Sequence, residues 1–174
     1  VTPRRVGGDC PDLPKHGPAE ADIPLPPEAA VNQAFVETAA AVLGTAPTTT
    51  SSDWDFTTTE LYGPRGTIVF DLGGAEVQLV VSRHGGTPRQ AADWWAARYG
   101  HCEPLRRHAL ADGTVLQVYP VTHESPMGPL QQAHLLRPDG LDYLITSVGT
   151  GDGALPVTGE QLAALAERLG EKLG

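Results

Sequence analysis

Apolar residues recur at two different spacings along the chain, and the spacing separates helices from strands. Spacings of three and four, which mark one face of a helix, occur in 27–43 and in the stretch after Thr158. Strict alternation, which marks a half-buried strand, runs through 67–72 and 75–82. The two patterns in one chain predict a domain that contains both helices and strands.

Capping residues locate the ends of three expected helices. The first covers 27–43 and stops at Gly44. The second begins at Thr87, whose capping-box partner is Gln90, and the third begins at Thr158 with Gln161 in the same role. The apolar stripe of the last helix consists of Leu162, Leu165, Ala166, Leu169 and Leu173.

Between the helices, β-favouring runs alternate with turn residues, and 45–52 forms a polar connector. Short turns such as Gly73-Gly74 force neighbouring strands to be antiparallel. We therefore expect an α+β fold in which three helices pack on a single antiparallel sheet of six or seven strands, in the order α-βββ-α-ββββ-α. The expected strands are 54–62, 67–72, 75–82, 105–110, 114–119, 130–136 and 141–148.

The density of proline and glycine sets the beginning of the chain apart. Residues 1–27 show no apolar period, so we expect an irregular arm followed by a single α+β domain over 28–174. A length of 174 residues suits one domain.

Charge excludes two classes of partner. The formal net charge is -9 and no basic run stands out, which argues against binding to nucleic acid or to an anionic membrane surface. No apolar run approaches the roughly 20 residues that span a bilayer. We expect any membrane attachment to come from a segment outside this sequence.

Two cysteines, Cys10 and Cys102, allow one disulfide. A bond between them would tie the arm to the domain and would imply an oxidising compartment. The alternative is a pair of free, buried thiols.

Turn and cap signatures in the second half resemble those of actinobacterial membrane-anchored or lipoprotein ectodomains. The segments concerned are Gly100–Glu103, Leu110–Thr114, Leu136–Leu141 and Val157–Ala166. The element order is also loosely similar to the Mog1/PsbP-like sandwich of LpqN-type lipoproteins and of some kinase sensor ectodomains. The resemblance implies an extracytoplasmic binding or sensing module without catalysis.

Motifs for nucleotide binding or for a nucleophile elbow are absent from the sequence. Among the histidines, His108 and His134 fall on expected strands and could approach each other across the sheet, but a zinc site would need further ligands. The others are His16, His84, His101 and His123.

Acidic residues offer two weaker candidates for chemistry. Asp53 and Asp55 would share one strand face, either as a cation or acid–base pair or as a solvated surface. The run His123-Glu124-Ser125 has suitable residue types for nucleophilic catalysis, although neighbours in sequence rarely form a triad.

Aromatic residues supply the candidate binding surface. Trp94 and Trp95 lie about 100° apart on a helix, so one ring can enter the core while the other sits at its edge. With Trp54 they are the expected ligand-binding residues, and we assign no catalytic residue, metal or cofactor.

Two hypotheses follow from these observations. The first is a non-catalytic binding or sensor ectodomain, secreted or anchored to the outer face of the cell membrane. Its partner would be a protein, a peptide or a lipid of the cell envelope. The second is a hydrolase or metal-dependent enzyme built on histidines and carboxylates.

Overall fold

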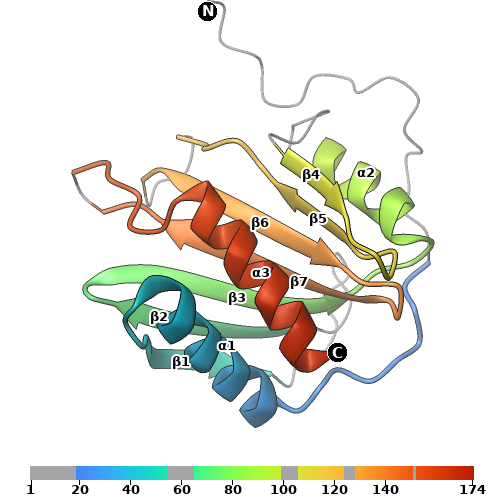
Figure 1. Ribbon diagram of the computed structural model, residues 1–174, viewed down its shortest axis with the longest axis horizontal. Helices are drawn as coiled ribbons and strands as arrows, with labels where there is room; N and C mark the ends of the chain where they lie inside the picture. The colour runs from blue at the N-terminus through green and yellow to red at the C-terminus, as the bar shows by residue number, and fades with distance from the viewer. Residues whose placement is uncertain (1–18, 55–64, 99–105, 124–127, 151) are drawn as a thin grey trace, which may run out of the picture.

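The computed structural model describes residues 19–54, 65–98, 106–123, 128–150 and 152–174, and in them one antiparallel sheet carries three helices (Figure 1). This confirms the expected α+β fold and its element order. The helices are α1 (Glu28–Leu43), α2 (Pro88–Arg98) and α3 (Gly159–Leu173). The strands are β1 (Thr48–Asp53), β2 (Gly66–Leu72), β3 (Ala75–Arg83), β4 (Arg106–Ala109), β5 (Val115–Val118), β6 (Leu130–Leu136) and β7 (Leu141–Val148).

The sheet joins two groups of hairpin-linked strands. Its spatial order is β1-β2-β3-β7-β6-β5-β4, and every neighbouring pair is antiparallel. The last strand in the chain, β7, inserts beside β3 and so closes the two groups into one sheet. At the β2–β3 turn, Gly73 and Gly74 have φ angles of 63° and 90°, a conformation that glycine adopts without strain.

The first strand of the sheet corrects one expectation. Residues 48–52 lie in the expected polar connector, but with Asp53 they form β1, an edge strand whose six residues are all exposed. Thr48–Thr50 favour strands because they are β-branched. The hydrophobic pattern misses β1 because no face of it is buried. Trp54 follows the strand, and the rest of the expected strand 54–62 lies outside the described residues.

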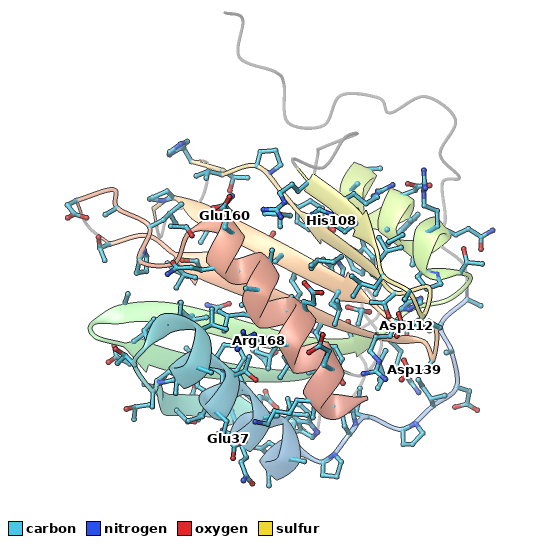
Figure 2. All side chains as sticks on the ribbon, in the orientation of Figure 1. Glu37, His108, Asp112, Asp139, Glu160 and Arg168 are labelled. Carbon is cyan, nitrogen blue, oxygen red and sulfur yellow. The ribbon has the colours of Figure 1, made fainter. Side chains whose placement is uncertain are left out.

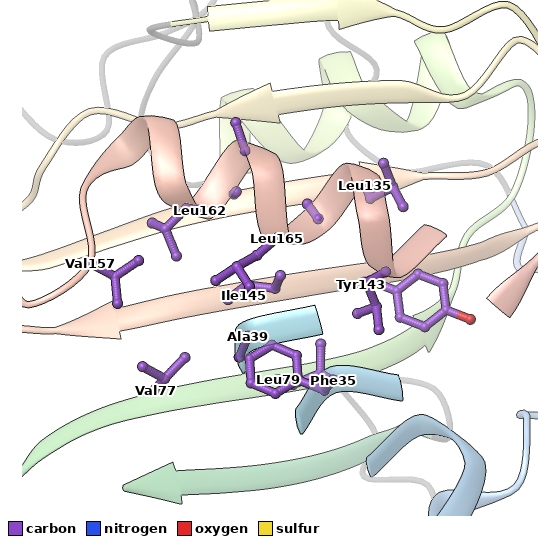
Figure 3. Packing of buried hydrophobic residues seen from close by; sticks show 14 of the residues in the cluster. Phe35, Ala39, Val77, Leu79, Leu135, Tyr143, Ile145, Val157, Leu162 and Leu165 are labelled. Atoms are coloured by element: carbon purple, nitrogen blue, oxygen red, sulfur yellow. The ribbon is translucent and has the colours of Figure 1, made fainter. Parts of the chain in front are cut away.

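The main hydrophobic core lies between the sheet and the pair α1 and α3, which cross its near face (Figures 1 and 3). Phe35 of α1 stacks on Phe70 of β2 with ring centroids 4.4 Å apart. Alternation places Val77, Leu79 and Val81 of β3 on this face, as expected, and each is at most 2% exposed.

Helix α3 approaches the sheet closely at its C-terminal end. A Cβ atom on Gly170 would lie 2.5 Å from Leu135 Cδ2, so a larger residue there would require the Leu135 side chain to shift. Arg137 Nη1 donates to the Gly170 carbonyl at 3.0 Å. At the other end, Thr158 and Gln161 form the expected capping box.

Helix α2 packs on the opposite face, behind β4 and β5 in Figure 1. Its buried contacts come from small residues, Ala91 and Ala92, which meet Val115 and Leu136. Thr87 and Gln90 exchange both hydrogen bonds of the expected capping box. The buried apolar residues of α2 are therefore alanines, and the larger Trp95 packs against them only partly buried.

The end of the expected arm, residues 19–27, has no regular secondary structure and runs along the domain. Ala21 N donates to the His84 carbonyl, and Trp54 Nε1 donates to the Pro26 carbonyl. Residues 1–18 lie outside the described residues. Among the described helices, none has the length and apolar character needed to cross a membrane.

Candidate functional site

A row of polar side chains lies on the sheet face that carries α2, four of them buried and the fifth, Ser82, half-buried. We call Gln117, Tyr119, His134, Asp142 and Ser82 the buried polar chain. Gln117 Nε2 donates to the Tyr119 hydroxyl at 2.7 Å, and that hydroxyl is 3.0 Å from His134 Nδ1. His134 Nε2 lies 2.8 Å from Asp142 Oδ1, which also accepts from Ser82 Oγ at 2.8 Å. The side chains are thus joined in a row by hydrogen bonds, and Asp142 Oδ1 is shared by His134 and Ser82.

Strand register brings these residues to one face. Gln117 of β5 is opposite His134 of β6, and Ser82 of β3 is opposite Asp142 of β7. Residues directly opposite in an antiparallel pair point to the same face. His134 and Asp142 are diagonal neighbours across the β6–β7 hairpin, a separation that long side chains can bridge.

Hydrogen-bond chemistry links the roles of neighbouring members of the buried polar chain. With Asp142 as a carboxylate, His134 Nε2 donates to it, and in a neutral His134 the Nδ1 atom then accepts from the Tyr119 hydroxyl. The Tyr119 oxygen then accepts from the Gln117 amide, whose nitrogen also donates to the Ala92 carbonyl of α2 at 3.0 Å. The bonds therefore run in one direction, toward Asp142.

Four members of the buried polar chain are closed to solvent, and Ser82 is half-buried. His134, Asp142 and Tyr119 are each 1% exposed. Asp142 Oδ2 has no hydrogen-bond partner among the described residues. A tyrosine, a histidine and a carboxylate in line are the residue types of a catalytic relay, but a substrate cannot reach them beneath α2.

At its Gln117 end, the buried polar chain is linked to the surface through Arg107 of β4. Its Nε and Nη2 donate to Gln117 Oε1 at 3.0 and 2.8 Å, and its Nη1 donates to Asp93 Oδ1 of α2 at 2.6 Å. Arg89 Nε approaches the same Asp93 oxygen at 3.9 Å. The charged groups of α2 and β4 are thereby linked to the buried residues.

The two neighbouring tryptophans of α2 occupy different positions. Their rings meet edge to face with centroids 4.8 Å apart. Trp95 packs on the Ala91–Ala92 cluster, and its ring lies 5.7 Å from that of His134. Trp94 is half-buried. The structure therefore sets one aromatic ring over the buried polar chain and a second ring beside it.

Trp54 lies apart from this pair, on the other face of the sheet. It packs against the main core and covers Gly66, where a Cβ atom would come within 2.2 Å of its ring. With its indole N–H bonded to Pro26, Trp54 fixes the arm to the domain. The structure does not bring the three tryptophans together.

His108 and His134, which the sequence would allow to approach each other across the sheet, do not do so. His108 pairs with Leu116, and His134 pairs with Gln117, the next residue of β5. Successive residues of a strand point to opposite faces, so the two histidines lie on opposite sides of the sheet. His108 is exposed and accepts from Arg106 Nε at 3.1 Å; Figure 2 labels it on β4.

The remaining described histidines have surroundings that differ. His84 is buried, and its Nε2 is 2.7 Å from the Arg137 carbonyl, which makes it part of the packing around the arm. His123 is exposed, as is Asp53. The other sequence candidates, His16, His101, Asp55, Glu124, Ser125 and both Cys10 and Cys102, lie outside the described residues. The disulfide stays a prediction.

Metal binding finds no support in the described part of the chain, where no three His, Cys, Asp or Glu side chains are grouped to hold an ion.

Among the described residues, the largest change in pKa is that of Tyr143, which lies on the opposite face from the buried polar chain. Burial raises the pKa of Tyr143 to about 12.

Sequence reasoning missed most of the buried polar chain. Polar residues such as Gln117 and Asp142 on strands are usually solvent-facing, and the sequence did not show which face α2 covers. A usable signal was present in the hairpin 130–148, because its turn fixes the register that makes His134 and Asp142 neighbours.

Comparison with known proteins adds no relative. No family model, no curated protein and no solved structure matches this chain.

Proposed function

We propose that the chain is a non-catalytic binding or sensor module that works outside the cytoplasm, secreted or held at the outer face of the cell membrane. The observation that supports it is the difference in burial on this face of the sheet: the His134–Asp142 pair is buried, while Trp94 and Trp95 of α2 are only half-buried. A binding role would use the surface of α2. The buried His134–Asp142 pair would then have a structural role beneath that surface.

The contact surface in this proposal is the outer side of α2 around Trp94. An aromatic side chain buries a large area at low conformational cost and commonly anchors an interface. The partner is a protein, a peptide or a lipid of the cell envelope. The alternative of a hydrolase has the residue types in Tyr119, His134 and Asp142 but lacks access to them.

Tryptophan emission tests this proposal, because two of the three tryptophans lie on α2. The chain is titrated with acidic, basic and uncharged synthetic peptides, and with phosphatidylcholine vesicles with and without phosphatidylglycerol. We expect a saturable change with at least one probe, lost in Trp94→Ala and kept in Trp54→Phe, which alters the other face.

Two results would contradict the proposal. The first is the absence of saturation with every probe. The second is ester hydrolysis by the intact chain, with p-nitrophenyl acetate as the probe, that disappears in a folded His134→Ala variant. Circular dichroism of each variant shows whether the fold is retained.

A further inference from the structure

A depression of about 300 Å³ lies between the first turn of α2 and the β4–β5 hairpin. It is lined by Arg89, Arg107, Ala109, Gly113 and Val115. Two arginines line it together with three uncharged residues. On a chain with a net charge of -9, this is a local concentration of positive charge.

Arg107 is held in place before any ligand arrives. Two of its N–H groups bond to the Gln117 amide oxygen and a third bonds to Asp93. A guanidinium group has five N–H donors, so these bonds leave two for another acceptor. Because Gln117 is fully buried and also bonded to Tyr119 and Ala92, the orientation of Arg107 is fixed from below.

The contacts of Asp93 show that the two arginines can bind a carboxylate group. Its Oδ1 atom takes the bond from Arg107 Nη1 and lies 3.9 Å from Arg89 Nε. The Asp93 side chain is 43% exposed and that of Arg89 is 73% exposed, so a second carboxylate can reach them from solvent. Two arginines against one aspartate leave a net positive charge, to which the N-terminal end of the α2 dipole adds.

We propose that the Arg89–Arg107 depression binds a carboxylate of an acidic peptide segment, with Asp93 as its internal competitor. The planar forks of Arg89 and Arg107 match a carboxylate, the group that Asp93 already places there. This inference rests on the proposed binding function and names the chemistry of its partner. A ligand bound to Arg107 would be linked to the buried polar chain through the hydrogen bonds between Arg107 and Gln117.

Isothermal titration calorimetry with acetyl-Glu-Glu-Glu-Glu-amide as the probe, at fixed ionic strength, tests the proposal on the full chain. The uncharged probe acetyl-Gln-Gln-Gln-Gln-amide is the comparison. We expect the glutamate peptide to bind more tightly. Arg89→Gln should weaken it about fivefold, the value of roughly one ion pair.

Asp93→Asn provides the sharper test, because removal of the competitor should tighten the glutamate peptide by about the same factor. A site in which Asp93 serves only to hold α2 would show weaker binding instead. Arg168→Gln is the matched control: it removes the same charge from an exposed position of α3, on the opposite face (Figure 2). We expect no change for that variant.

Three results would overturn the inference. These are equal binding of the two peptides, no effect of Arg89→Gln, and binding of phosphatidylglycerol vesicles but not of peptide through Arg89. If another probe still binds in a Trp94-dependent way, only the carboxylate site fails. If no probe binds at all, the proposed binding function fails with it.

Discussion

The two faces of the sheet are built in opposite ways. On the α1 and α3 face, large apolar side chains such as Phe35, Ile145 and Leu165 fill the interface. On the α2 face, small alanines meet a row of hydrogen-bonded polar residues. A dry apolar layer stabilises a fold through burial, whereas a polar layer fixes geometry and contributes less net free energy. The first face holds the domain together, and the second is the one we expect to bind.

Two tyrosines illustrate the difference. Tyr119 and Tyr143 are both 1% exposed, but they point to opposite faces. The hydroxyl of Tyr119 joins Gln117 to His134, while no hydrogen bond to the Tyr143 hydroxyl occurs in the described part of the chain. The same residue type is a link in a network on one face and mainly a large apolar body on the other.

The largest effect should come from a cavity in the dry face. Leu165 is fully buried, so Leu165→Ala should lower the free energy of unfolding by about 3 kcal/mol. Urea denaturation measures the change. Val121→Ala, which trims an exposed apolar side chain, is the control and should change stability by less than about 0.5 kcal/mol. A loss below about 1 kcal/mol for Leu165→Ala would contradict the claim that the apolar α1 and α3 face holds the domain together.

Alkaline pH should lower the free energy of unfolding through Tyr143, which lies on the α1 and α3 face. Burial raises the pKa of Tyr143 from 10.0 to about 12. Between these values the unfolded chain has lost the proton and the folded chain keeps it, so the free energy of unfolding falls as pH rises, by about 2 to 3 kcal/mol in total. Urea titrations from pH 9 to pH 12 should show this fall in the unmodified chain and a smaller one in Tyr143→Phe. Equal slopes for both would refute the assignment.

At neutral pH the two tyrosines should differ in how much their hydroxyl groups contribute to the free energy of unfolding. Tyr119→Phe removes the hydrogen bonds to Gln117 Nε2 and to His134 Nδ1 and leaves the buried His134 Nδ1 without its partner on Tyr119, which should cost about 2 kcal/mol. Tyr143→Phe removes no described hydrogen bond and should cost less than about 0.5 kcal/mol. Parallel urea denaturation of both variants measures the difference. Similar losses would mean that the buried polar chain contributes nothing specific.

The two capping boxes give the smallest effect and the finest comparison. Thr87 and Thr158 have the same chemistry, each paired with a glutamine three residues later. Each change to alanine should cost about 1 kcal/mol of helix stability. For Thr158→Ala that loss should appear in global unfolding, whereas for Thr87→Ala it should appear in the local opening of α2. Hydrogen exchange and urea denaturation of both variants distinguish the two cases.

The dry face was predictable from the sequence, and the polar face was not. Alternation in 67–72 and 75–82 places the inward side chains correctly, and the caps at Thr87 and Thr158 locate two helices. Both signals are local. They depend only on neighbours along the chain and on the rule that apolar residues are buried.

The candidate site depends on long-range packing instead. Nothing in the stretch 88–98 shows that its alanines and Trp95 cover polar residues of β5 and β6. Arg107 and Asp93 come together only when β4 pairs with β5 beneath α2. Trp54, an expected ligand-binding residue, packs on the main core and bonds to the Pro26 carbonyl, contacts that also depend on long-range packing.

The central claim is that α2 is held less tightly than the α1 and α3 layer and forms the binding face. Native-state hydrogen exchange measured residue by residue tests it directly. We predict that amides of α2 open with a free energy well below that of global unfolding, and that buried amides of α1 and α3 open only with the whole domain. If amides of all three helices exchange with the same free energy, the two faces are equivalent and the claim is wrong.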